Sequence, residues 1–190
     1  MSSKSKTKGN SWEREVANHL SELYKSKFIR VPSSGAFVGG KNKVRKEFLH
    51  EGQIRLMKGD IIPPDKWKFF NCECKSYADF PFHQVLAGDC KVLDGWLDQM
   101  MDVADENDFN VLFMKFNRKG RFVVVQSKYT FICDQFLYFT SKNHKDWLII
   151  EFDHFWKHNQ DLIKTYSNKS DTTSIIKSET KNLLPSLNLH

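Results

Sequence analysis

Three residues in one short stretch have the types and spacing of a hydrolytic site. Asp60 is followed thirteen residues later by Glu73, and Lys75 comes two residues after Glu73. Carboxylates suit Mg²⁺, a hard cation that keeps several waters and prefers carboxylates together with substrate phosphate. A bound Mg²⁺ would polarise a phosphate and activate a water. Lys75 would hold or help deprotonate that water and balance the charge that builds on the phosphate.

The elements around these residues must bring them together. Lys66–Tyr77 is rich in aromatic residues and is predicted to be a strand, so Glu73 and Lys75 lie on one face of it. Gly59–Ile62 is a short run that two prolines end. If the two runs pair as a hairpin, Asp60 lies beside Glu73. The alternative is an ordinary strand end that carries a solvated Glu and Lys.

An acid, a variable gap and then acid-x-lysine on a strand resembles the PD-(D/E)xK nuclease superfamily, although Gly59 stands where the family name has Pro. The resemblance implies an α/β fold with a restriction-endonuclease-like core, in which helices flank a central mixed β-sheet. It also implies Mg²⁺ as the cofactor, with Mn²⁺ as a substitute. Asp60, Glu73 and the backbone carbonyl of Cys74 would then be metal ligands.

A second part of the resemblance lies in Lys8–Glu15, KGNSWERE, which is similar to the K-G-x-x-x-E-R-E opening of archaeal-type Holliday-junction resolvases. In that branch the first acid of E-R-E joins the metal site, and it corresponds to Glu13. Helical spacing also places Glu13 beside the core, whereas Glu15 falls on the solvated face. The alternative for Glu13 is a capping-box glutamate three residues after Asn10.

A third part is the short run into Ser33, Ser34 and Gly35, which resembles the Ser-Gly turn near the phosphate in these nucleases. Ser33 and Ser34 are candidates for a DNA-contacting hydroxyl, and Arg30 is expected nearby. The alternative is an ordinary loop with local hydrogen bonds. The resemblance covers roughly residues 8–126, with four elements in the family's order.

Two further features are candidates for DNA binding. The insertion 39–58 is basic, and we expect it to grip phosphates beside the site, the alternative being a solvated loop; its cations include Lys41, Lys43, Arg45, Lys46 and Lys58. A long core-facing helix is expected after Phe80-Pro81-Phe82, and Leu86 begins its apolar repeat. Gln99 lies in a W-x-x-Q pattern that resembles phage-type nucleases, so it is a candidate for contact with the site or the DNA. The alternative for Gln99 is an exposed polar flank.

The rest of the chain predicts one domain over residues 10–165, after a flexible basic arm at 1–9 and before a loosely ordered tail at 166–190. The first helix is expected to open at Asn10 or Ser11 and run to about Lys25. Further strands are expected at Phe109–Asn117, Arg121–Gln126 and Trp147–Phe152, with a helix over 153–165. Tyr129–Phe139 is ambiguous between strand and other structure.

Composition limits the class of protein. A net charge of +6 favours a polyanionic partner, and neither a signal peptide nor a membrane span is expected, so we expect a cytoplasmic protein of a bacterium or a phage-infected cell. Four cysteines without a C-x-x-C pair indicate reduced thiols rather than zinc ligands.

The function expected from these features is Mg²⁺-dependent endonucleolytic hydrolysis of DNA. The resemblance implies a Holliday-junction resolvase of phage or bacterial type, acting in recombination as a homodimer. The alternatives are a restriction-type or homing endonuclease or a recombination exonuclease with the same site, and a non-catalytic DNA-binding module.

Overall fold

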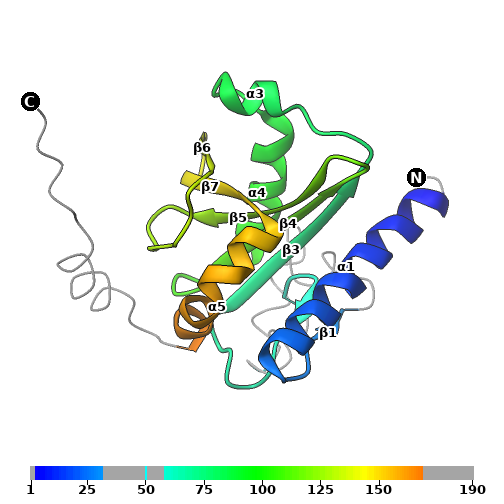
Figure 1. Cartoon of the computed structure of the whole chain (residues 1–190), viewed down its shortest axis with the longest axis vertical. Helices are drawn as coiled ribbons and strands as arrows, with labels where there is room; N and C mark the ends of the chain where they lie inside the picture. Colours follow the sequence, from blue (N-terminus) through cyan, green and yellow to red (C-terminus); the bar gives the residue numbers. More distant parts are fainter. Residues whose placement is uncertain (1–2, 32–49, 51–57, 169–190) are drawn as a thin grey trace, which may run out of the picture.

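A computed structural model of the chain describes residues 3–31, 50 and 58–168 (Figure 1). Its helices are α1 (Ser3–Tyr24), α3 (Phe82–Leu86), α4 (Lys91–Val103) and α5 (Phe152–Asn168). Its strands are β1 (Ile29–Arg30), β2 (Ile61–Ile62), β3 (Phe70–Tyr77), β4 (Phe109–Phe116), β5 (Gly120–Gln126), β6 (Leu137–Ser141) and β7 (Lys145–Glu151). No helix of the described part is long and apolar enough to cross a bilayer.

Five strands form one mixed sheet in the order β3-β4-β5-β7-β6. Strands β3 and β4 are parallel and in register from Phe70 opposite Phe109 to Tyr77 opposite Phe116, and the other neighbouring pairs are antiparallel. The connection between the two parallel strands contains α3 and α4, as a parallel crossover requires. β3 is therefore an edge strand of this sheet, and β1 and β2 form a separate antiparallel pair. The expected central mixed sheet flanked by helices is confirmed.

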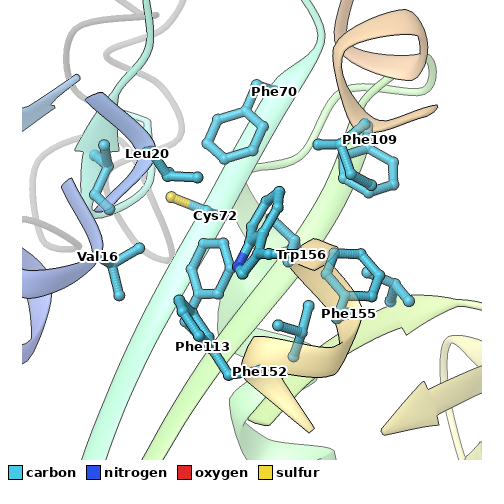
Figure 2. Close-up of a cluster of buried hydrophobic side chains, with 14 of the residues drawn as sticks. Val16, Leu20, Phe70, Cys72, Phe109, Phe113, Phe152, Phe155 and Trp156 are labelled. Atoms are coloured by element: carbon cyan, nitrogen blue, oxygen red, sulfur yellow. The ribbon is translucent and has the colours of Figure 1, made fainter. Parts of the chain in front are cut away.

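The two faces of the sheet bury separate apolar layers, because successive side chains of a strand point to opposite faces. On β4, Val111 and Phe113 join the layer under α1 and α5, whereas Leu112 and Met114 join the layer under α3 and α4. Figure 2 shows Phe113 in the first layer together with Trp156 of α5 and Val16 of α1. A sheet covered on both faces explains the continuous apolar run of β4.

Several predicted boundaries move. Helix α1 begins at Ser3, so the expected start at Asn10 or Ser11 is wrong. Ser3–Gly9, which we expected to belong to a flexible basic arm, lies in this helix. No proline interrupts this segment, and the Asn10 side chain accepts a hydrogen bond from Arg30 instead of capping a helix. At the other end, α5 continues to Asn168, past the expected end at residue 165. Residues 169–190 lie outside the described part.

The single long helix predicted after Phe82 is wrong, because two helices stand there. Gly88 has a φ of +74°, a left-handed conformation that suits glycine and ends the first helix. Leu86, which we expected in the core, is 74 % exposed just before this break. The strands expected at 109–117, 121–126 and 147–152 are confirmed as β4, β5 and β7, and the ambiguous segment contributes β6.

Candidate active site

Asp60 binds the edge of β3 that faces away from β4 through two hydrogen bonds. Its backbone N–H donates to the carbonyl of Cys72 at 3.0 Å, and its Oδ2 accepts from the backbone N–H of Cys74 at 2.7 Å. The expected hairpin between the two runs is wrong, since β2 pairs with β1 rather than with β3. Asp60 nevertheless lies beside Glu73, because its carboxylate is bound at Cys74, the residue between Glu73 and Lys75.

Gly59 makes this close approach feasible. Its φ is +68°, and a Cβ atom built on it would lie 2.4 Å from the carbonyl oxygen of Cys72. A side chain of any kind at position 59 would therefore collide with the backbone of β3. Proline is excluded as well, because its ring holds φ near −65°. The conformation explains why this chain has Gly rather than Pro before the first acid of the motif.

Glu73 and Lys75 share one face of β3, as the alternation predicts, and that face lies against α4. The Lys75 ammonium donates to Oε1 of Glu73 at 2.6 Å and to Oε1 of Gln99 at 2.7 Å. The Gln99 amide in turn donates to Oε1 of Glu73 at 2.7 Å. Gln99 is thus both an exposed residue of α4 and a member of this cluster, where the W-x-x-Q pattern was the signal for it.

Glu13 of α1 is close enough to Asp60 to feel its charge, and it pairs with Arg30 of β1. Its Oε2 accepts a hydrogen bond from Nε of Arg30, whose Nη2 donates to Oδ1 of Asn10 at 2.7 Å. Glu15 points away from this group and binds Lys115 and Arg121 instead. Glu13 therefore faces Arg30 and Glu15 faces the cations of β4 and β5, so the two acids point in different directions, as helical spacing predicts.

The three carboxylates act on one another electrostatically. Burial, followed by the charge of Asp60, raises the pKa of Glu73 to about 7, even though Lys75 opposes the change. Burial and the same Asp60 charge raise the pKa of Glu13, against the opposing effect of Arg30. The negative charges of Glu13 (α1), Asp60 (before β2) and Glu73 (β3) are therefore close enough to repel one another. Such mutual resistance to ionisation is typical of functional sites.

The donor set has the chemistry of a site for a hard divalent cation, although the described residues contain no ready-made group of three or more His, Cys, Asp or Glu ligands. Mg²⁺ does not need three protein ligands of these types, since it is commonly held by one or two carboxylates with waters and substrate phosphate. Asp60 and Glu73 would supply the carboxylates. The Cys74 carbonyl points to the same strand edge as the Cys74 N–H that binds Asp60. These oxygens fit the metal that the motif implies.

Lys58 has a different role from the phosphate contact that we expected. Its side chain is buried and pairs with Asp108 and, at 2.7 Å, with Asp105. The pair ties the residue before Gly59 to the turn that leads into β4. No sequence pattern indicated Asp105 and Asp108 as partners, because both lie far along the chain from Lys58. Six of the predicted DNA-contacting residues lie outside the described part of the chain: Ser33, Ser34, Lys41, Lys43, Arg45 and Lys46.

The two cysteine thiols near the site belong to the apolar core. Cys72 and Cys74 are free and buried, and burial raises the pKa of both thiols well above the ordinary value. They face the apolar layer under α1, where a neutral thiol packs as a small apolar group.

Comparison with known proteins identifies the same family. Residues 4–165 match the model of a family described as "Phage putative PDDEXK endonuclease". No curated protein and no solved structure matches the chain. The match spans α1, the Gly59-Asp60 approach, Glu73, Lys75 and most of α5, which are the elements that build the site. The chain belongs to this family of phage endonucleases, within the PD-(D/E)xK nuclease superfamily.

Proposed function

We propose that the protein is a Mg²⁺-dependent endodeoxyribonuclease that hydrolyses phosphodiester bonds. The observation that carries the proposal is the bond from the Cys74 N–H to the Asp60 carboxylate, which sets this acid beside Glu73 and Lys75 on an edge strand. A family of nucleases implies DNA as the substrate, and the net charge of +6 is consistent with a polyanion.

Each residue has a distinct part in this proposal. Asp60, Glu73 and the Cys74 carbonyl would hold Mg²⁺ (or Mn²⁺), and Glu13 would add negative charge beside them. The metal, when bound, polarises the phosphate and lowers the pKa of a bound water. Lys75 lies within hydrogen-bonding distance of Glu73, so its ammonium can orient the attacking water and offset charge on the phosphate. Glu73 would bind the metal as the carboxylate, and the Gln99 amide holds its Oε1 in place by a hydrogen bond.

The preferred DNA is a finer part of the proposal. We favour a branched substrate such as a Holliday junction, on the basis of the KGNSWERE resemblance, with a homodimer cutting two strands. The competing class is a restriction-type or homing endonuclease, or a recombination exonuclease, that uses the same metal chemistry. A module that binds DNA without cutting it is the remaining alternative.

One experiment separates these classes. The purified protein is given a four-way junction, a linear duplex and a single strand, each with Mg²⁺ and at several salt concentrations. Preferred cutting of the junction at physiological salt supports the resolvase, and cutting of particular linear sequences supports the restriction type. Binding without cutting under any condition would remove the nuclease proposal.

Two substitutions test the assigned roles in the same assay. Asp60→Asn should abolish both cutting and the rise in melting temperature that Mg²⁺ produces, because it removes a metal ligand. Lys75→Ala should abolish cutting while much of the Mg²⁺-induced rise remains. The exposed Glu106 is a matched control, and Glu106→Gln should change neither. Equal loss of the metal effect in both site variants would contradict the role given to Lys75.

A further inference from the structure

A stack of aromatic rings runs from the protein interior to the end of β3. Tyr77 stacks on Trp96 of α4, with ring centroids 5.0 Å apart and planes 26° apart. Trp96 stacks in turn on Phe80 at 5.5 Å, and Phe80 on Phe116 at 4.9 Å. The three inner rings are buried, whereas Tyr77 is 45 % exposed. Tyr77 is thus a large apolar ring held rigidly at the surface.

The position of Tyr77 relates this ring to the candidate active site. Alternation places it on the same face of β3 as Glu73 and Lys75, and all three side chains meet α4. Two strand residues span about 7 Å, so Tyr77 is one such step beyond Lys75. A phosphate bound beside Lys75 therefore has the base of its own or the neighbouring nucleotide within reach of the ring.

Basic groups lie at the same end of the strand. The backbone N–H of Asn117 donates to the carbonyl of Tyr77 at 3.3 Å, which sets the turn between β4 and β5 against it. Arg118 is exposed in this turn, and Lys119 makes an exposed ion pair with Asp79. An exposed pair contributes little to stability, so Lys119 can exchange its partner for a phosphate at small cost. Cations beside an exposed ring match the chemistry of a single nucleic-acid strand.

We propose that Tyr77 stacks on a nucleobase next to the phosphate that is cut. A base inside a duplex has both faces covered by its neighbours, so only an unpaired or splayed base offers a face to the ring. This inference rests on the proposed function and narrows its substrate class to DNA with an open base beside the cut, as at a branch point, a fork or a single-stranded segment.

The test uses a forked DNA with the fluorescent base 2-aminopurine at the first unpaired position, in EDTA so that no strand is cut. Binding should change the fluorescence through stacking, and Tyr77→Leu should weaken binding about 5- to 150-fold, the range that one base–aromatic stack provides. Tyr77→Phe should bind as the wild type does, because the ring is kept. Tyr138 is 52 % exposed on β6, at the opposite edge of the sheet, and Tyr138→Leu is the matched control, with no expected effect.

The outcomes separate this inference from the proposed function. A wild type that binds the fork no better than Tyr77→Leu, or leaves the fluorescence unchanged, overturns the stacking role even if the protein cuts DNA with Mg²⁺. A Tyr77-dependent fluorescence change with no cutting under any Mg²⁺ condition keeps the stacking role and removes the nuclease. With 2-aminopurine inside a fully paired duplex, wild type and Tyr77→Leu should give the same signal, and a ring-dependent change there would also overturn the inference.

Discussion

Glu73→Gln tests whether burial and the neighbouring carboxylates raise the pKa of Glu73. Folding raises the pKa of Glu73 from 4.5 to about 7, chiefly through burial and then through Asp60. The folded protein therefore binds a proton that the unfolded chain has released between these pH values. The corresponding stability is fully present below pH 4.5 and is lost as the pH rises through 7. Over the whole range the loss is about 3 kcal/mol, since one pKa unit is worth about 1.4 kcal/mol.

Gln at position 73 cannot titrate, so the metal-free variant should escape this loss. From pH 5 to pH 8 the wild type should lose about 2 to 3 kcal/mol more unfolding free energy than Glu73→Gln does. In a chain of this size the difference corresponds to roughly 5 to 10 °C in melting temperature. The assay is urea unfolding in EDTA at several pH values. Glu106→Gln, which changes an exposed glutamate, should follow the wild type.

Added Mg²⁺ completes the test, because the metal competes with the proton for the Glu73 carboxylate. At pH 8 and at 100 times its dissociation constant, Mg²⁺ should stabilise the wild type by about 2.7 kcal/mol. The same Mg²⁺ should stabilise Glu73→Gln much less. Parallel pH profiles for wild type and variant in EDTA would refute the reasoning, because Glu73 would then titrate as an ordinary solvated acid.

Two further substitutions test how Asp60 is positioned. Gly59→Ala and Gly88→Ala both place a side chain at positive φ, which costs roughly 1 to 2 kcal/mol. Only Gly59→Ala also meets the Cys72 carbonyl, so it should cost about 2 kcal/mol more in urea unfolding and abolish cutting; equal costs would contradict the close approach. Lys58→Met breaks a buried ion pair and should cost about 3 to 5 kcal/mol. Lys119→Met breaks an exposed pair and should cost at most about 1 kcal/mol, and similar losses in both would contradict the burial of Lys58.

Periodicity predicted the features that depend on neighbours along one element. Alternation along β3 placed Glu73 and Lys75 together on one face, and helical spacing directed Glu13 inward. The apolar run of β4 predicted a strand covered on both sides. Each of these inferences needs only the period of a strand or helix, which residues within the element already determine.

The features that the sequence did not predict depend on contacts between distant segments. We expected Lys58 to be a surface cation, because its partner Asp105 lies 47 residues away and no periodic pattern links the two residues. The edge approach of Asp60 depends on the backbone of Gly59 against that of Cys72, and side-chain patterns do not record such a contact. The break at Gly88 was missed because the apolar spacing continues across it, while φ there is positive.

The most direct test of the account is the position of a bound metal in crystals soaked with Mn²⁺. Anomalous scattering should give one strong peak about 2 Å from a carboxylate oxygen of Asp60 and of Glu73, on the side of the Cys74 carbonyl. The Lys75 ammonium should lie beside the peak without contacting the ion. A saturating soak that leaves Asp60 and Glu73 without a shared peak, or that places the ion elsewhere, would contradict the central claim.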